Sequence, residues 1–199
     1  MYIAGIVPES GQAAATLVAE GGTCTVKLEK AILHGCGVVI RKGALLTAIE
    51  CSSRNAHGDS VCVQDAGSSV NARYCTFADN QECGVNVSSG GKAELYQCTF
   101  SGSKKSHGLA VQDACSFANA LHCTFADNQR AGVMVCGTGK ATLEECQCSS
   151  ISCRHTGSEV KAVKCKLDKV NVHKYEGGVV VIKGNFGSKI LGMMSKLMD

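Results

Sequence analysis

Proline and tryptophan are nearly missing from this chain, which has one proline, Pro8, and no tryptophan among 199 residues. Glycine is frequent, with 23 residues, but without proline it excludes a collagen-like helix and indicates many tight turns. No run approaches the roughly 18 apolar residues of a membrane-spanning helix. The net charge of +3 is too small to indicate nucleic-acid binding by itself.

The first residues, Met1 to Val7, have neither the basic start nor the full apolar stretch of a signal peptide. The 14 cysteines would indicate disulfides in a secreted chain. Most of them recur at one position of a repeat, as small buried residues do. We therefore expect reduced thiols and an intracellular reducing compartment, either the cytosol or the interior of an organelle.

A repeat dominates what is present. The run Val63-Gln64-Asp65-Ala66, followed by Cys75-Thr76-Phe77-Ala78-Asp79-Asn80-Gln81, returns 48 residues later as Val111-Gln112-Asp113-Ala114 and Cys123-Thr124-Phe125-Ala126-Asp127-Asn128-Gln129. A weaker copy lies between the two, so the elementary period is about 24 residues, which is typical of solenoids. The continuity of the repeat favours a single repeat domain.

Within each unit, apolar residues alternate in runs of three to six between glycine and polar turns, as at Ala93 and Leu95. No helical pattern separates these runs, so the sequence predicts an all-β solenoid, a parallel β-helix of about eight coils. One strand recurs in every coil, and we expect it at Thr16–Val18, Val38–Ile40, Val61–Val63, Val85–Val87, Leu109–Val111, Val133–Val135, Ile151–Cys153 and Val179–Val181. The turn between Cys146 and Ile151 is five residues short, and the last coil is expected to be long.

Two further columns follow from the same register. The first is cysteine, at Cys51, Cys75, Cys98, Cys123, Cys146 and Cys165. Neighbouring coils would hold these sulfurs about 5 Å apart, too far for a disulfide, so we expect a ladder of buried thiols. The second contains Asn80 and Asn128 with Ser103 between them, and indicates a polar stack at a turn.

The last residues change period. We expect the β-helix to occupy residues 1–187 and a short amphipathic helix to occupy 188–199, with Ser188 as its N-cap. Its apolar residues would either cap the open end of the solenoid or dock a partner or membrane surface. The interaction residues expected there are Ile190, Leu191, Met194 and Leu197.

The pattern Gly-Gly-x-Ala-x-Leu-x-x-Cys-x-Phe-x-x-Asn-x-x-x-Gly-Val-x-Val resembles the right-handed parallel β-helix repeat of the pectin-lyase-like superfamily. It is most similar to the intracellular branch with short, regular coils, over residues 16–182. The resemblance implies a single-stranded, right-handed β-helix. It leaves function open, because relatives include polysaccharide lyases, hydrolases and epimerases, carbohydrate binders and non-catalytic interaction domains.

Asp65 and Asp113 are the candidate catalytic acids, because they occupy one register two coils apart. That separation is about 10 Å, near the upper limit for an inverting pair of carboxylates. Aspartate also favours turns, and no third acid joins them, so we expect turn residues rather than a catalytic site. The Gly-His-Gly and paired-Asp motifs of polygalacturonases and the Asp-Pro-His-Glu motif of alginate epimerases are absent.

A candidate zinc site lies at Cys146, Cys148, Cys153 and His155, where the coil is shortened. Zinc needs four ligands in tetrahedral geometry, whereas Cys146 and Cys153 fit core positions, so we expect buried thiols and no cofactor. The histidines, among them His107 and His122, are expected at turns or on the surface.

We expect a non-catalytic scaffold or protein–protein interaction module, one subunit of a larger assembly, rather than an enzyme. The alternative is a carbohydrate-active enzyme or carbohydrate-binding module. Nucleic acid is not an expected partner, because the lysines near the C-terminus have almost no aromatic residues between them.

Overall fold

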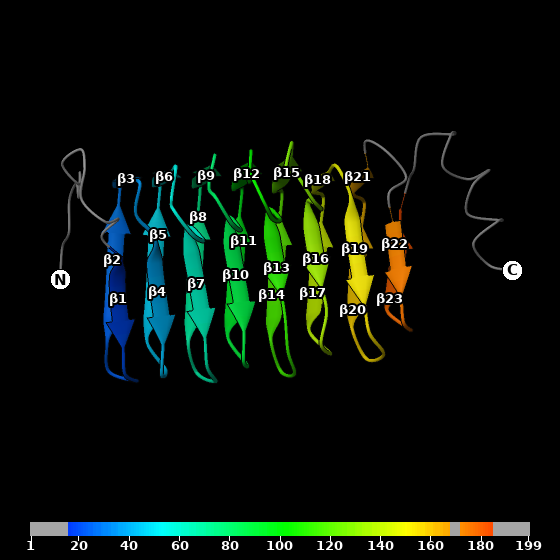
Figure 1. Ribbon diagram of the computed structural model, residues 1–199, viewed down its shortest axis with the longest axis horizontal. Helices are drawn as coiled ribbons and strands as arrows, with labels where there is room; N and C mark the ends of the chain where they lie inside the picture. The colour runs from blue at the N-terminus through cyan, green and yellow to red at the C-terminus, as the bar shows by residue number, and fades with distance from the viewer. Residues whose placement is uncertain (1–15, 168–171, 185–199) are drawn as a thin grey trace, which may run out of the picture.

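The computed structural model describes residues 16–167 and 172–184, which form 23 strands and no helix. The chain winds into a solenoid of about seven coils with three parallel sheets (Figure 1). Seven coils contribute a strand to each sheet, and two further strands begin an eighth coil. The predicted all-β solenoid is therefore confirmed. The predicted helix at 188–199 lies outside the described residues.

Each coil contributes strands to the sheets in the same order. Sheet I contains β1 (Leu17–Glu20), β4 (Val38–Arg41), β7 (Val61–Gln64), β10 (Val85–Ser88), β13 (Leu109–Val111), β16 (Val133–Val135), β19 (Ile151–Arg154) and β22 (Val172–Tyr175). Sheet II contains β2 (Thr25–Glu29), β5 (Leu45–Ile49), β8 (Ser69–Arg73), β11 (Lys92–Tyr96), β14 (Phe117–Leu121), β17 (Lys140–Glu144), β20 (Glu159–Val163) and β23 (Val179–Lys183). Sheet III contains β3 (Ile32–His34), β6 (Ser52–Arg54), β9 (Thr76–Ala78), β12 (Thr99–Ser101), β15 (Thr124–Ala126), β18 (Gln147–Cys148) and β21 (Lys166–Leu167).

Two of the predicted sheet I strands are wrong. The first begins one residue later than predicted, because Ala19, and not Val18, pairs with Ile40. Ala19 is 1% exposed whereas Val18 is 50% exposed, so burial of the small residue sets the register. The last was placed in the wrong sheet: residues 179–181 belong to β23 of sheet II, and β22 completes sheet I. β22 could not be recognised in the sequence, because its two inward positions do not both hold apolar residues.

The core is narrow and is filled by one column of side chains for each inward strand position. On sheet III this column includes Phe77, Phe100 and Phe125, whose rings stack with centroids 5.1 and 4.8 Å apart and planes 14° and 8° from parallel. On sheet II most inward positions are alanine, valine or leucine, for example Ala93 and Leu95. Small residues on one sheet therefore leave room for the rings on another, which gives the close packing of a protein interior.

A single residue makes the turn from sheet II to sheet III in every coil. Its φ is positive, between 49° and 57°, although it is never glycine in the seven coils: it is Lys30, Glu50, Tyr74, Gln97, His122, Glu145 and Lys164. The next residue is buried and small, alanine in the first coil and one cysteine of the predicted column in each of the other six. A left-handed conformation costs a non-glycine residue about 1–2 kcal/mol, so the stacked coils must stabilise these turns.

The asparagine stack is also confirmed. The Oδ1 of Asn80 accepts a hydrogen bond of 3.1 Å from the backbone N–H of Ala56, and that of Asn128 accepts one of 3.1 Å from the N–H of Ser103. In each case the acceptor belongs to the coil after the donor. These buried amides therefore fasten the connection from sheet III to sheet I of one coil to the next.

Replacing Phe100 with alanine should lower the free energy of unfolding by about 3–5 kcal/mol, because a fully buried ring in the middle of the stack leaves a cavity between two neighbours. Urea unfolding followed by circular dichroism measures this. Thr99→Ala, on the outer side of the same strand, is the matched control and should change stability by less than about 1 kcal/mol. Equal losses in the two variants would contradict the stacked core.

Candidate functional site

Asp65 and Asp113 both lie in the turn from sheet I to sheet II, with φ of 71° and 68°. The Oδ2 of Asp65 accepts a hydrogen bond of 3.1 Å from the backbone N–H of Lys42, and that of Asp113 accepts one of 3.4 Å from the N–H of Ser89. Each carboxylate therefore holds the turn of the preceding coil. The structure gives both residues the turn role that favours aspartate, with an intervening coil between them.

The four candidate zinc ligands are distributed over different parts of the coil. Cys146 lies in the turn after sheet II, Cys148 faces the core from sheet III, and Cys153 faces it from sheet I. His155 lies in the next turn, with its Nε2 3.1 Å from a carboxylate oxygen of Glu176. Within residues 16–167 and 172–184, no three histidine, cysteine or acidic side chains are grouped as metal ligands would be. Ile190, Leu191, Met194 and Leu197 lie outside the described residues.

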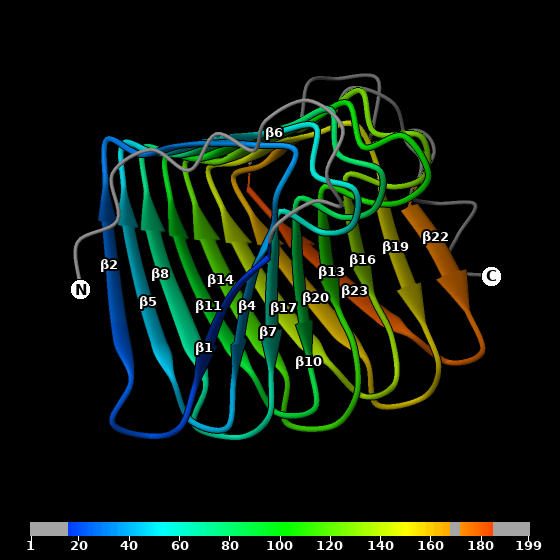
Figure 2. The ribbon, with the colours of Figure 1, turned by 60° about the vertical axis from the view of Figure 1, so that its left-hand side comes forward.

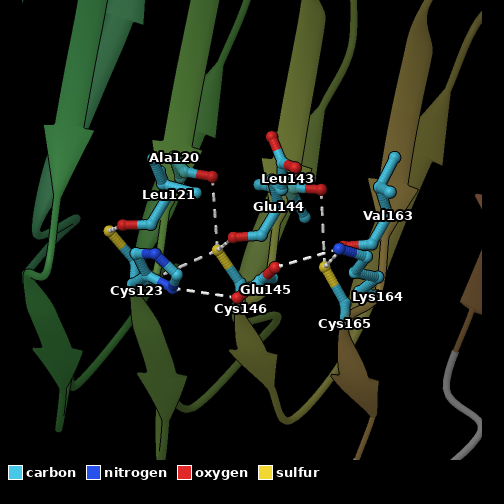
Figure 3. Close-up of polar contacts among 11 residues, drawn as sticks. Ala120, Leu121, Cys123, Leu143, Glu144, Glu145, Cys146, Val163, Lys164 and Cys165 are labelled. Atoms are coloured by element: carbon cyan, nitrogen blue, oxygen red, sulfur yellow. Dashed lines mark hydrogen bonds and ion pairs between the residues drawn. The ribbon is translucent and has the colours of Figure 1, made fainter. Parts of the chain in front are cut away.

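The cysteine column, defined as Cys51, Cys75, Cys98, Cys123, Cys146 and Cys165, is buried along its whole length. From Cys75 onward, each sulfur lies between two backbone carbonyl oxygens, one two residues earlier and one in the preceding coil. For Cys146 these are the oxygens of Glu144 and Ala120, both 3.3 Å from Sγ (Figure 3). Each S–H group therefore has acceptors available without a disulfide.

All 14 cysteines belong to the described residues, and none of them forms a disulfide. Hydrogen bonds with neighbouring thiols, together with burial, raise the pKa of Cys51, Cys123 and Cys165. Burial and then the charge of Asp59 raise the pKa of Cys62 to about 11 and that of Cys83 to about 12. Thiols held protonated in this way are poor nucleophiles, so these five cysteines are structural.

Thiol labelling should separate the cysteines by burial. With a chromogenic disulfide reagent on the native protein, Cys115 should react first, because it is the exposed one, and Cys115→Ser should remove the fast phase. All 14 thiols should react in denaturant. Rapid native labelling of the cysteine column, or thiols that stay blocked in denaturant, would contradict this account.

Sequence reasoning did not single out Asp59, whose carboxyl group is half-buried beside sheet I. Its Oδ1 accepts a 2.7 Å hydrogen bond from the N–H of Cys83, and its Oδ2 accepts one of 3.0 Å from the amide of Asn86. Burial raises the pKa of Asp59 in spite of these donors. The amide of Gln112 extends the network to Asn86 at 3.0 Å, so the carboxyl group anchors a polar chain across three coils.

The outer face of sheet II carries a shallow groove of about 560 Å³ that crosses β8, β11, β14 and β17. Its wall includes Arg73, Tyr96 and Leu121 from the last strand position, with Asn71, Glu94, Asn119, Thr142 and Glu144 around them. Inside it, the amide of Asn119 donates a 3.1 Å hydrogen bond to Glu94. We call this hollow the sheet II groove.

A second hollow, of about 710 Å³, adjoins the groove at the turn into sheet III and is lined by His122, Glu145 and Lys164 among others. The carboxylate of Glu145 lies between His122 Nδ1, at 3.4 Å, and Lys164 Nζ, at 3.3 Å. The ring of Tyr96, in the wall of the groove, meets that of His122, in the wall of this hollow, edge-on at 5.8 Å. These residues share the strand end and the turn that follows it. The shared position of these residues in the repeat could be recognised from the sequence, whereas the concave surface that they form could not.

No known protein-family model matches this chain, and no curated protein is significantly similar to it. None of the described residues belongs to a helix that could cross a membrane.

Proposed function

We propose that this protein is a non-catalytic β-solenoid that binds a protein partner through the sheet II groove, as one subunit of a larger assembly. The observation that carries the proposal is the outer face of sheet II. Eight parallel strands, five residues long and paired residue for residue, form an unbroken outer surface that is hollowed over four of them. Repeat proteins commonly use such extended surfaces for binding.

The composition of the groove supports a protein partner. Tyr96, Arg73 and Leu121 combine a large ring, a guanidinium and an aliphatic side chain at adjacent places, with polar residues around them. Tyrosine and arginine are enriched at the energetic centres of protein interfaces, and polar rims surround such centres. The backbone beneath is fixed by the sheet, so little conformational entropy is lost on binding.

We further propose that the coil is right-handed and that the chain is related to the pectin-lyase-like superfamily, in its branch of short, regular coils. The three parallel sheets, the ring stack of sheet III and the buried asparagines support this relationship. The lack of disulfides among the 14 cysteines supports an intracellular reducing compartment as the place where the protein works.

The alternative is carbohydrate binding in the same groove. The observation that favours it is the placement of amide side chains, those of Asn71 and Asn119, beside the ring of Tyr96. A sugar presents an apolar face and a rim of hydroxyls, which such a ring and such amides complement. Carbohydrate cleavage has less support, because Asp65 and Asp113 are engaged in turns.

Leu121→Arg tests the protein-partner proposal. A tagged chain in its native cells should elute from a sizing column in a complex with a stoichiometric partner, and the substitution should weaken that complex by about tenfold or more, because it places a charge in the groove. Leu45→Arg is the matched control: Leu45 is an exposed leucine on the same outer face but outside the groove, and its replacement should leave the complex intact.

Elution of the wild-type chain as a monomer in those cells would contradict the proposal. So would equal loss of the complex in both variants. Saturable binding of an oligosaccharide to the purified chain, lost in Leu121→Arg and kept in Leu45→Arg, would favour the carbohydrate alternative instead.

A further inference from the structure

The shortened coil opens a cleft beside sheet I. On this sheet, Val87 pairs with Val111 and Val111 with Val135, so those coils advance in equal steps, whereas Val135 pairs with Cys153, only 18 residues later. The missing residues belong to the connection from sheet III to sheet I. Residues 149–150 alone join β18 to β19, whereas residues 127–132 join β15 to β16. Figure 2 shows the longer connections gathered at one corner of the solenoid.

The cleft at this step has a volume of about 390 Å³. The longer connections of earlier coils contribute His107 and Arg130 to its wall, and the ends of β19 and β22 contribute Arg154, His173 and Tyr175. No aspartate or glutamate is among the described residues that line it. Neither guanidinium forms an ion pair with a carboxylate of the described residues. Among the described residues, the cleft therefore carries positive charge that no carboxylate balances.

Ser152 lies on the floor of the cleft with an unsatisfied hydroxyl group. It sits between Ile151 and Cys153, which face the core, so its own side chain faces outward into the cleft. The residue is only 4% exposed, and its Oγ has no hydrogen-bond partner among the described residues. A buried hydroxyl without a partner is costly in a folded protein, and a ligand oxygen at this place would satisfy it.

His107 adds a neutral donor: it lies in the connection from β12 to β13, in agreement with the expected turn position, but it is only 6% exposed. Its Nδ1 accepts a 3.0 Å hydrogen bond from the N–H of Ala131, so the neutral ring carries its proton on Nε2. Burial, followed by the charges of Arg130 and Arg154, lowers the pKa of His107 to about 4. The ring is thus neutral at physiological pH, and both guanidinium groups lie close enough for their charges to affect it.

Tyr175 closes the other side of the cleft and holds Arg154 in place. The guanidinium carbon of Arg154 lies 5.1 Å from the centre of the Tyr175 ring, and the ring of His173 stacks on the same tyrosine at 5.9 Å. An arginine fixed by an aromatic face loses little freedom when it binds an oxyanion.

We propose that this cleft binds a phosphate dianion, either as free phosphate or as the phosphate group of a small phosphomonoester. Two unpaired guanidinium groups match its double charge, and Ser152 Oγ and His107 Nε2 supply neutral hydrogen-bond donors to its oxygens. The volume is at the lower end of the range for small-molecule sites, which suits a phosphate or a sugar phosphate and excludes a dinucleotide. This site is separate from the sheet II groove and does not depend on the proposed partner.

Calorimetric titration of the full chain at low salt tests this proposal, with inorganic phosphate, glucose 6-phosphate and glucose as probes. We expect saturable binding of one phosphate group per chain and none of glucose. Stronger binding of the ester than of phosphate would identify a phosphomonoester as the ligand, and equal or weaker binding would identify free phosphate. No saturable binding of either phosphate probe at millimolar concentration would overturn the proposal. Tighter binding of a phosphopeptide than of inorganic phosphate and glucose 6-phosphate would also overturn the proposal.

Three variants separate binding from folding. Arg130→Met should weaken phosphate binding about tenfold or more, because it removes one charged donor. Arg54→Met, which removes an exposed arginine of sheet III, is the matched control and should leave binding unchanged. Ser152→Ala should weaken binding without lowering the melting temperature, since the hydroxyl has no hydrogen-bond partner to lose among the described residues. Unchanged binding in both Arg130→Met and Ser152→Ala would overturn the proposal.

Discussion

The pairing of each coil with the next, residue for residue, is the constraint on which the rest of the structure depends. Backbone hydrogen bonds of the three parallel sheets hold equivalent positions of successive coils at the spacing of strands. Side chains at one position therefore form a column, whether they are the rings of Phe77, Phe100 and Phe125 or the thiols that follow the sheet II turn. The left-handed turn residues are tolerated because every neighbouring coil has the same turn.

The same regularity makes one irregular coil important. Where the chain from β18 to β19 lacks residues that the four preceding connections from sheet III to sheet I have, the sheets continue in register and only the connection is shortened. The cleft beside sheet I thus forms without any change in the core of the solenoid, and charged residues from the coils on both sides line it. The groove on the outer face of sheet II and the cleft beside sheet I are two different surfaces of a single repeat. The first depends on the continuity of the repeat, and the second depends on its interruption.

Much of the fold could be predicted from the sequence because burial in a solenoid repeats with the chain. The cysteine column and the asparagine pair were recognisable because identical residues return at one period. The last strand of sheet I could not be predicted, because β22 does not bury a pair of valines. The alternating apolar pattern that begins at Val179 belongs to β23 of sheet II. The cleft beside sheet I could not be predicted, because His107, Arg130 and Ser152 come from three coils. These residues come together because of the path that the connections follow beside sheet I. The repeat period of the sequence carries no information about that path.

The most direct test of this account is the stability of a chain that lacks one complete coil. Residues 88–111 span the distance between the paired positions Val87 and Val111, so their deletion leaves every remaining position in register. Urea unfolding followed by circular dichroism should show a folded, cooperative β protein of reduced stability, whereas deletion of residues 88–99, about half a coil, should abolish folding. Loss of folding in both deletions, or survival of both, would contradict the claim that coil-to-coil register determines the structure.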